Sequence, residues 1–334
     1  MTDTTSYAGY LFAYFVASDP DDGEQIRFAR SVGDDPLHWA ELNAGAPWLR
    51  VGEGTGGARD PFLLRAAGLP GETARFYLLA TDLRMGHANQ SRDWAAVQRH
   101  GSRGIFVWES PDLVEWSPPR LVELAPPEAG NTWAPEATFD PETGSYFVYW
   151  ASKLYPAAGS RDGVDSYNRM LAATTTDFRS FSEPFVWLDP GRSVIDATIA
   201  HHDGWYYRFV KDERTPDSAT FDAKFITLER SRLLRSTEYE FVAAGLGAAK
   251  HLGGAGAVVR GEGPIILPSN TDPSRWYLFV DEFGLRGYVP FTSTDIGSAD
   301  WSPCPDFTMP RGVTHGSVLQ LTAEEWVRVG RLIG

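Results

Sequence analysis

The chain has 334 residues, 43% of them hydrophobic, and a formal net charge of −14. This acidity argues against nucleic acid and anionic membranes as partners, because phosphate groups are bound by clustered Lys and Arg. Cys304 is the single cysteine, which excludes an intrachain disulfide and a cysteine-based metal site. All-β architectures often use such a length for one domain, and no boundary is visible, so we expect a single domain over residues 1–334.

The N-terminal residues lack a basic segment followed by an apolar segment and a small-residue cleavage site. No apolar run approaches the roughly 18 residues that cross a bilayer. These observations predict a cytoplasmic protein. A chain from which a signal peptide had been removed would look the same.

A short pattern recurs along the chain: a Ser or Thr, then an Asp, then an aromatic residue a few positions later. Its copies cover residues 31–39, 110–116, 175–181, 292–301 and, in degraded form, 231–241. Each copy follows an aromatic-rich strand, at residues 10–15, 76–81, 146–150, 205–210 and 276–280. The spacing of roughly 55 to 80 residues holds one four-stranded blade, so the sequence predicts an all-β, five-bladed β-propeller. A β-sandwich with irregular repeats is the alternative.

The two ends of the chain predict how such a ring closes. Residues 316–321 form a late strand with no outer strands after it, and residues 10–15 and 25–30 are early strands with no inner strand before them. Joining them into one shared blade closes the ring. Helices are expected only at residues 93–99 and 323–330.

Four predicted innermost strands begin with a carboxylate: Asp60, Glu136, Asp196 and Glu262. Innermost strands face the central axis, so these groups should converge on one pocket, from equivalent places in consecutive blades. Such a cluster is typical of a metal site, of glycoside hydrolysis, or of a structural polar ring. Glycoside hydrolysis needs two carboxyl groups with different pKa values, which mutual repulsion between neighbours can provide.

The four motifs, in this order, resemble those of glycoside hydrolase family 43. The resemblance covers Arg59-Asp60-Pro61, Trp133-Ala134-Pro135-Glu136, Val194-Ile195-Asp196 and Gly261-Glu262-Gly263-Pro264. It implies that Asp60 is the general base, Glu262 the general acid and Asp196 the group that tunes the pKa of the acid. Trp133 and Glu136 would contact the substrate. Ala197-Thr198 departs from the family's more usual Pro-Ser.

The resemblance also implies single-step inversion, with Asp60 deprotonating a water and Glu262 protonating the leaving oxygen. In inverting enzymes the two carboxyl groups stand about 6.5–9.5 Å apart, which leaves room for that water. Asp196 would keep Glu262 protonated by like-charge repulsion.

Other candidates each carry a plain structural alternative. Trp133 is a pocket wall or core, and Glu136 binds a sugar hydroxyl or accepts from a backbone amide. Arg208 and Lys211 bind a hydroxyl or pair with carboxylates. His315, in Thr314-His315-Gly316-Ser317, points down the central channel, and family members often have a His there, sometimes beside calcium. A satisfied buried histidine is equally compatible, so no cofactor is required and a calcium near His315 stays open.

The expected partner is therefore an oligosaccharide or glycoside. The Arg-Asp-Pro-Phe form of the base motif resembles furanosidase branches of the family, so α-L-arabinofuranosidase is the first choice, followed by β-D-galactofuranosidase and β-xylosidase. The segment 83–100 would close one end of the pocket, which favours exo action. A non-catalytic carbohydrate-binding propeller is the alternative from another class.

Overall fold

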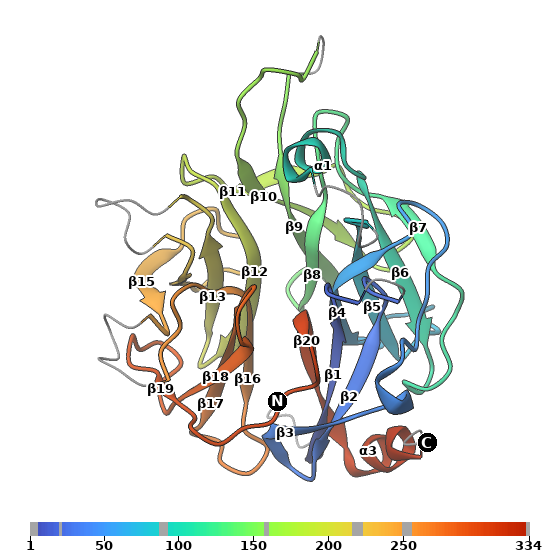
Figure 1. The fold of residues 1–334 in the computed structure, drawn as a ribbon, viewed down its shortest axis with the longest axis vertical. Coiled ribbons are helices and arrows are strands. Elements are labelled where there is room, and N and C mark those ends of the chain that lie inside the picture. Colours follow the sequence, from blue (N-terminus) through green and yellow to red (C-terminus); the bar gives the residue numbers. More distant parts are fainter. Residues whose placement is uncertain are drawn as a thin grey trace.

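The computed structural model describes residues 6–19, 22–86, 93–156, 160–215, 223–248 and 256–331. These residues form five antiparallel sheets of four strands each, arranged as the blades of a ring (Figure 1). The innermost strands are β4 (Ala58–Arg65), β8 (Trp133–Asp140), β12 (Val194–His202), β16 (Glu262–Pro268) and β20 (Thr314–Thr322). Each of them contacts the innermost strand of the next blade, and β20 contacts both β16 and β4. The predicted five-bladed propeller is confirmed.

The remaining strands follow outward in each blade. The second strands are β1 (Tyr7–Phe15), β5 (Phe76–Asp82), β9 (Ser145–Lys153), β13 (Trp205–Asp212) and β17 (Trp276–Glu282). The third strands are β2 (Arg27–Val32), β6 (Gly104–Ser110), β10 (Asn168–Thr175), β14 (Ile226–Ser231) and β18 (Gly287–Ser293). The outer strands are β3 (Asp35–Glu41), β7 (Arg120–Glu123), β11 (Phe185–Leu188), β15 (Glu240–Leu246) and β19 (Ser302–Pro303).

The aromatic strands supply the core, which lies between blades. Five clusters of buried apolar side chains are present among the described residues, and each joins two neighbouring blades. Trp108, Trp150, Trp187 and Trp301 are among the largest fully buried side chains. A strand buried on both faces reads as a nearly continuous apolar run, as β5 and β17 do.

The recurring Ser/Thr-x-Asp pattern forms the turn between the third and the outer strand. Ser110 Oγ accepts a hydrogen bond from the Leu113 amide at 2.8 Å, and Asp112 Oδ1 accepts from the Glu115 amide at 2.8 Å. In the next blade Thr175 and Asp177 accept from backbone amides in the same way. These bonds satisfy amides that the sharp turn leaves without strand partners.

The ring is closed by β1, which pairs antiparallel with β20 from Tyr7↔Thr322 to Phe15↔Thr314. The helix α3 (Ala323–Gly330) follows β20 directly and begins with a capping box of Thr322 and Glu325. Glu325 also receives two hydrogen bonds from Arg65 on β4, at 2.6 and 2.8 Å, which ties the C-terminal helix to the next blade. The predicted closure is therefore confirmed.

Two further helical segments complete the fold. The helix α1 (Trp94–His100) is capped by Asp93, and η1 (Asn43–Gly45) is a single 3₁₀ turn. Both helices predicted from the sequence are thus present. Within the described ranges, no helix is long and apolar enough to span a membrane.

Candidate active site

All five innermost strands carry a β-bulge near their first residues. On β4 the pairing with β5 runs from Arg59↔Thr81 to Phe62↔Leu79, so two residues face one. The same shift separates β8 from β9, β12 from β13, β16 from β17 and β20 from β1. A bulge bends its strand and redirects the side chains beside it, which is why bulges are common next to active sites.

The bulges show that the four predicted carboxylates do not occupy equivalent places, which corrects that expectation. Asp60 and Asp196 take the same bulge position, with left-handed φ angles of 50° and 55°. Glu262 stands one residue earlier, where Arg59 stands on β4. Glu136 stands two residues after the bulge position, where β4 has Phe62.

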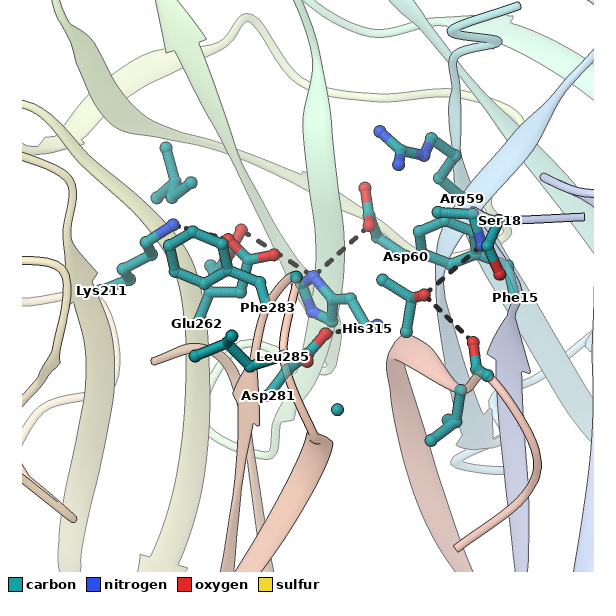
Figure 2. A pocket seen from close by; sticks show the side chains of 18 of the residues that line it. Phe15, Ser18, Arg59, Asp60, Lys211, Glu262, Asp281, Phe283, Leu285 and His315 are labelled. Atoms are coloured by element: carbon teal, nitrogen blue, oxygen red, sulfur yellow. Dashed lines mark hydrogen bonds and ion pairs between the residues drawn. The ribbon is translucent and has the colours of Figure 1, made fainter. Parts of the chain in front are cut away.

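A cavity of about 1000 Å³ opens beside these bulges. It is lined by the residue before the bulge on every innermost strand and, where the side chain is long enough, by the bulge residue itself. Five of the seven predicted site residues therefore meet there: Asp60, Trp133, Asp196, Glu262 and His315. They come from five different blades, and Figure 2 shows three of them, Asp60, Glu262 and His315, with their neighbours.

Asp60 is held by two groups. The Thr81 hydroxyl donates to Asp60 Oδ2 at 2.8 Å, and it accepts from the Ala134 amide at 2.8 Å, which fixes the direction of its own proton. His315 Nδ1 lies 3.4 Å from Asp60 Oδ1. The carboxyl group is therefore oriented by neighbours from two blades while its side chain stays 15% exposed.

Asp196 lies deeper, with its side chain 7% exposed. Its Oδ2 accepts from the Gly263 amide at 3.2 Å, and its Oδ1 lies 3.9 Å from His315 Nδ1. Burial raises the pKa of Asp196 to about 6, helped by the charges of Glu262 and Asp60 and opposed by His315 and Lys211. Asp196 thus links the strand that bears Glu262 to the histidine beside Asp60.

Glu262 forms an ion pair with Lys211, whose Nζ lies 2.6 Å from Glu262 Oε2. Lys211 is buried and has a second partner, Glu213 Oε2, at 2.7 Å. Burial opposes its charge, but the carboxylates of Glu262, Glu213 and Asp196 outweigh that effect and raise the pKa of Lys211. In the structure Lys211 pairs with carboxylates, which is one of the two roles that the sequence left open for it.

Asp281 was missed in the sequence. It pairs in register with Glu262, lines the cavity and accepts from the His315 amide at 3.2 Å. Burial first, and then the charge of Glu262, raise the pKa of Asp281 well above its usual range. The signal was present, because Asp281 interrupts the apolar run 276–280 at its end, where a charged residue on a buried strand needs a partner.

Aromatic side chains form another part of the cavity wall. Trp133 packs edge-on against Trp94 of α1, with 6.0 Å between ring centroids. The Arg59 guanidinium lies 5.5 Å from the Trp94 ring and 4.7 Å from the Phe15 ring. The segment 83–100 contributes to this wall through Leu83, Trp94 and Gln98, and its residues 87–92 lie outside the described residues.

Glu136 and Arg208 lie outside the cavity. Glu136 accepts from the Tyr149 hydroxyl at 3.2 Å, and burial raises its pKa to about 8. Arg208 donates to Glu229 Oε2 from Nε at 3.0 Å and from Nη2 at 2.6 Å. The roles of Glu136 and Arg208 as substrate contacts stay predictions. Arg208 pairs with a carboxylate in the structure, which is the alternative role that the sequence left open for it.

The side chains around His315 offer a cation few ligands. Over the described parts of the chain, no group of three or more His, Cys, Asp or Glu side chains is arranged to hold a metal ion. His315 Nδ1 instead faces the oxygens of Asp60 and Asp196. The calcium that the resemblance left open stays a prediction, and the roles of Asp60 and Glu262 do not depend on it.

Comparisons with known proteins agree with the motifs. The model of a glycoside hydrolase family 43-related family, described as "Probable glycosyl hydrolase domain", matches residues 5–327. An α-L-arabinofuranosidase of Bifidobacterium longum is 31% identical over an alignment of 321 residues, which covers 89% of this chain and 29% of that protein. The chain therefore spans less than a third of that relative. The resemblance predicted from the four motifs is confirmed.

Solved structures share the fold at low identity. The α-L-arabinofuranosidase Arb93A of Fusarium graminearum has a TM-score of 0.54 at 16% identity, with 91% of this chain and 81% of that chain covered. An α-L-arabinanase of Penicillium chrysogenum has a TM-score of 0.53 at 15% identity, with 92% and 82% covered. At such identities the likeness supports the propeller architecture alone.

Proposed function

This chain belongs to the family of probable glycosyl hydrolase domains related to glycoside hydrolase family 43, and we propose that it is an inverting, exo-acting α-L-arabinofuranosidase. One observation carries the proposal: Asp60 and Glu262 line the same cavity from different sides of His315 (Figure 2). A glycosidase needs one carboxyl group on each side of the bond that it breaks.

Asp60 is the general base in this proposal. Its carboxylate takes a proton from a water that attacks the anomeric carbon. Thr81 occupies Oδ2 and His315 lies near Oδ1, so both neighbours fix the plane of the carboxylate without covering it. A base held in one orientation is expected to favour attack from one face of the sugar.

Glu262 is the proton donor to the leaving oxygen. Asp196 is the neighbouring carboxyl group, and it can hold a proton for the cluster while Lys211 pairs with Glu262. The raised pKa of Asp196, about 6, supports retention of that proton in mildly acidic solution. When Glu262 is protonated, Lys211 still has Glu213 as a partner.

The choice of sugar rests on the relative from Bifidobacterium longum, which is named an α-L-arabinofuranosidase. Exo action is supported by the wall of Leu83, Trp94 and Gln98, which lines one part of the cavity. A cytoplasmic location and a glycoside or oligosaccharide substrate belong to the same proposal. β-D-Galactofuranosides and β-xylosides are the competing substrates.

The test is a panel of nitrophenyl α-L-arabinofuranoside, β-D-galactofuranoside and β-D-xyloside, run with the wild type and with Asp60→Asn. We expect the arabinofuranoside to be turned over fastest and the variant to lose about 10²- to 10⁴-fold in kcat, the usual contribution of a general base. Asp300→Asn, at an exposed carboxylate outside the cavity, is the control. NMR of the first-formed sugar should show inverted anomeric configuration.

Other outcomes would contradict parts of the proposal. Turnover by Asp60→Asn at the wild-type rate would remove Asp60 from the mechanism, and retained configuration would replace single-step inversion by a two-step route. Saturable sugar binding with no turnover on any of the three substrates would favour the non-catalytic propeller.

A second variant tests the donor. Glu262→Gln cannot give a proton, so hydrolysis of an alkyl glycoside, whose leaving alcohol needs protonation, should fall far more than hydrolysis of a nitrophenyl glycoside. Equal losses on both substrates, measured as kcat/KM, would contradict the donor role.

A further inference from the structure

One part of the cavity rim is apolar and has no role in the proposed chemistry. It consists of Phe283 and Leu285 in the β17–β18 hairpin and of Phe307, Met309 and Pro310 between β19 and β20. Leu285 is 58% exposed. We call these five residues the apolar rim.

Two members of the apolar rim, Phe283 and Leu285, lie on the side of Glu262 (Figure 2). Phe283 follows Asp281, the register partner of Glu262, by two residues. Its ring lies 4.4 Å from Lys211 Nζ, so the lysine that pairs with Glu262 also contacts Phe283. Figure 2 shows Phe283 and Leu285 beside Glu262 and Lys211, and Asp60 on the other side of His315.

The hairpin that carries Leu285 is fixed. Glu282 is buried and accepts from Arg286 Nε and, at 2.8 Å, from the Val259 amide. Arg286 Nη2 donates to the Ala257 carbonyl at 2.6 Å, and the Arg260 guanidinium lies 4.8 Å from the Phe283 ring. Leu285 is therefore held at the cavity mouth by a network of charged groups.

The chemistry of the apolar rim decides what it binds. Of the cavity-lining residues in segments 283–287 and 307–310, Arg286 is the one with a polar side chain, and its Nε and Nη2 already donate to Glu282 and to the Ala257 carbonyl. A second sugar placed there would find few hydrogen-bond partners, and each hydroxyl group buried without one would cost free energy. An alkyl or aryl group would instead bury apolar area, worth up to about a fourfold gain in affinity for each methylene.

The proton donor of a glycosidase faces the oxygen that joins the sugar to its leaving group, so the leaving group extends toward the donor's side. We infer that the apolar rim is a binding site for an apolar leaving group, such as an alkyl or aryl alcohol, rather than for a second sugar. This inference rests on the proposed role of Glu262.

The first experiment uses methyl, propyl, hexyl and octyl α-L-arabinofuranosides, whose leaving alcohols have similar acidity, so that only apolar contact changes along the series. We expect kcat/KM to rise about two- to fourfold per methylene over the first carbons, the upper figure being full burial. A flat series, or faster hydrolysis of arabinobiose than of the octyl glycoside, would overturn the inference.

Leu285→Ser should flatten this series, judged by the octyl-to-methyl ratio within each protein. Val259→Ser is the matched control, because Val259 is 67% exposed, lies next to the same hairpin and does not line the cavity. An unchanged ratio in Leu285→Ser, or an equal drop in Val259→Ser, would count against the apolar rim.

Calorimetric binding of octyl and methyl 1-thioglycosides of the three panel sugars separates this inference from the proposed function, because it needs no turnover. Tighter binding of the octyl compound, lost in Leu285→Ser, would support the apolar rim even if no panel sugar were hydrolysed. Equal binding of both, or binding of neither, would overturn it.

Discussion

At the scale of single residues, the site depends on a buried cation that serves two carboxylates. Lys211 pairs with Glu262 and Glu213 and stands close enough to Asp196 to lower its pKa. Removing one partner of such a group leaves the other charges without compensation in a medium of low dielectric constant. Replacing Lys211 should therefore change the protonation of these carboxyl groups more than it changes the stability of the fold.

Lys211→Met tests this. Without the cation, the pKa of Asp196 should rise further, so the alkaline limb of kcat/KM, which we expect near pH 6 in the wild type, should move up by about one unit or more. The measurement is a pH profile on an alkyl glycoside. The control is Lys224→Met, since Lys224 contacts Glu213 but not Glu262. An alkaline limb at the same pH in the wild type, Lys211→Met and Lys224→Met would contradict an electrostatic effect of Lys211 on the carboxyl groups.

Glu136 makes a prediction about stability. Burial raises its pKa from 4.5 to about 8 in the folded protein, so the folded state holds a proton that the unfolded state loses near pH 4.5. The stabilisation is complete below about pH 4.5 and is lost as the pH rises toward 8, at roughly 1.4 kcal/mol per pH unit for one proton. Glu136→Gln should remove this slope.

Denaturant unfolding at pH 5 and pH 8 measures that difference in the free energy of unfolding. Glu142→Gln, at an exposed carboxylate, is the control and should keep the wild-type slope. A slope that persists in Glu136→Gln would mean that the folded protein holds Glu136 charged.

At the scale of elements, the bulge at the head of each innermost strand sets which side chains reach the cavity. The residue before the bulge lines the cavity on every blade, whereas Phe62, Glu136, Thr198 and Ile265, which follow the bulges, do not line it. Side chains alternate between faces along a strand, so a shift of one residue changes the face. This explains why Glu136 lies in the core although it stands, like the other three carboxylates, near the head of an innermost strand.

Gly263 is the bulge residue on β16, and its small size is needed there. Its φ is 50°, and a Cβ would stand 2.8 Å from His315 Cγ and 3.1 Å from the Tyr288 hydroxyl. Gly263→Ala should displace His315 and weaken the bond from the Gly263 amide to Asp196, with a loss in kcat/KM of about tenfold or more.

The control is Gly144→Ala, in the β8–β9 turn, with φ 63° and nothing within 4 Å of its Cβ. It carries the same cost of a left-handed conformation, about 1 kcal/mol, without crowding the site. Stability should fall in both variants and activity only in Gly263→Ala. Equal activity losses would show that conformational strain alone, and not contact with His315, is responsible.

At the scale of the whole molecule, the ring is held by the pairing of its two ends. Strands β1 and β20 belong to segments about 300 residues apart in sequence, and this contact must form before the fifth interblade core is complete. Because each core lies between two blades, opening one junction exposes apolar area on both sides of it.

Gly316→Ala tests the closure. Its Cβ would meet the Ala13 carbonyl oxygen at 2.1 Å and Tyr14 Cα at 3.0 Å, both of which are backbone atoms that cannot rotate away. We expect a loss of more than about 2 kcal/mol in the free energy of unfolding, typical of overpacking in a tight core. Gly52→Ala, with nothing within 4 Å of its Cβ, should stay near wild type. Equal denaturation midpoints would indicate that β1 and β20 separate easily.

The sequence by itself determined the architecture and the three carboxyl groups placed at its centre. Blade strands and turns are local patterns, since a buried strand reads as an apolar run and a tight turn as Ser/Thr-x-Asp. Asp60, Asp196 and Glu262 could be located because they stand at the head of such strands. Closure of the ring followed from counting strands at the two ends.

The tertiary structure decided which other groups stand beside those carboxyl groups. Lys211 and Asp281 reach Glu262 from neighbouring strands, and Arg208, three residues before Lys211, points to the opposite face and pairs with Glu229. These contacts depend on the bulges and on how adjacent blades are rotated against each other. The sequence of a single strand predicts neither the bulges nor the rotation of the blades, because both arise only when sheets far apart in sequence pack around a common axis.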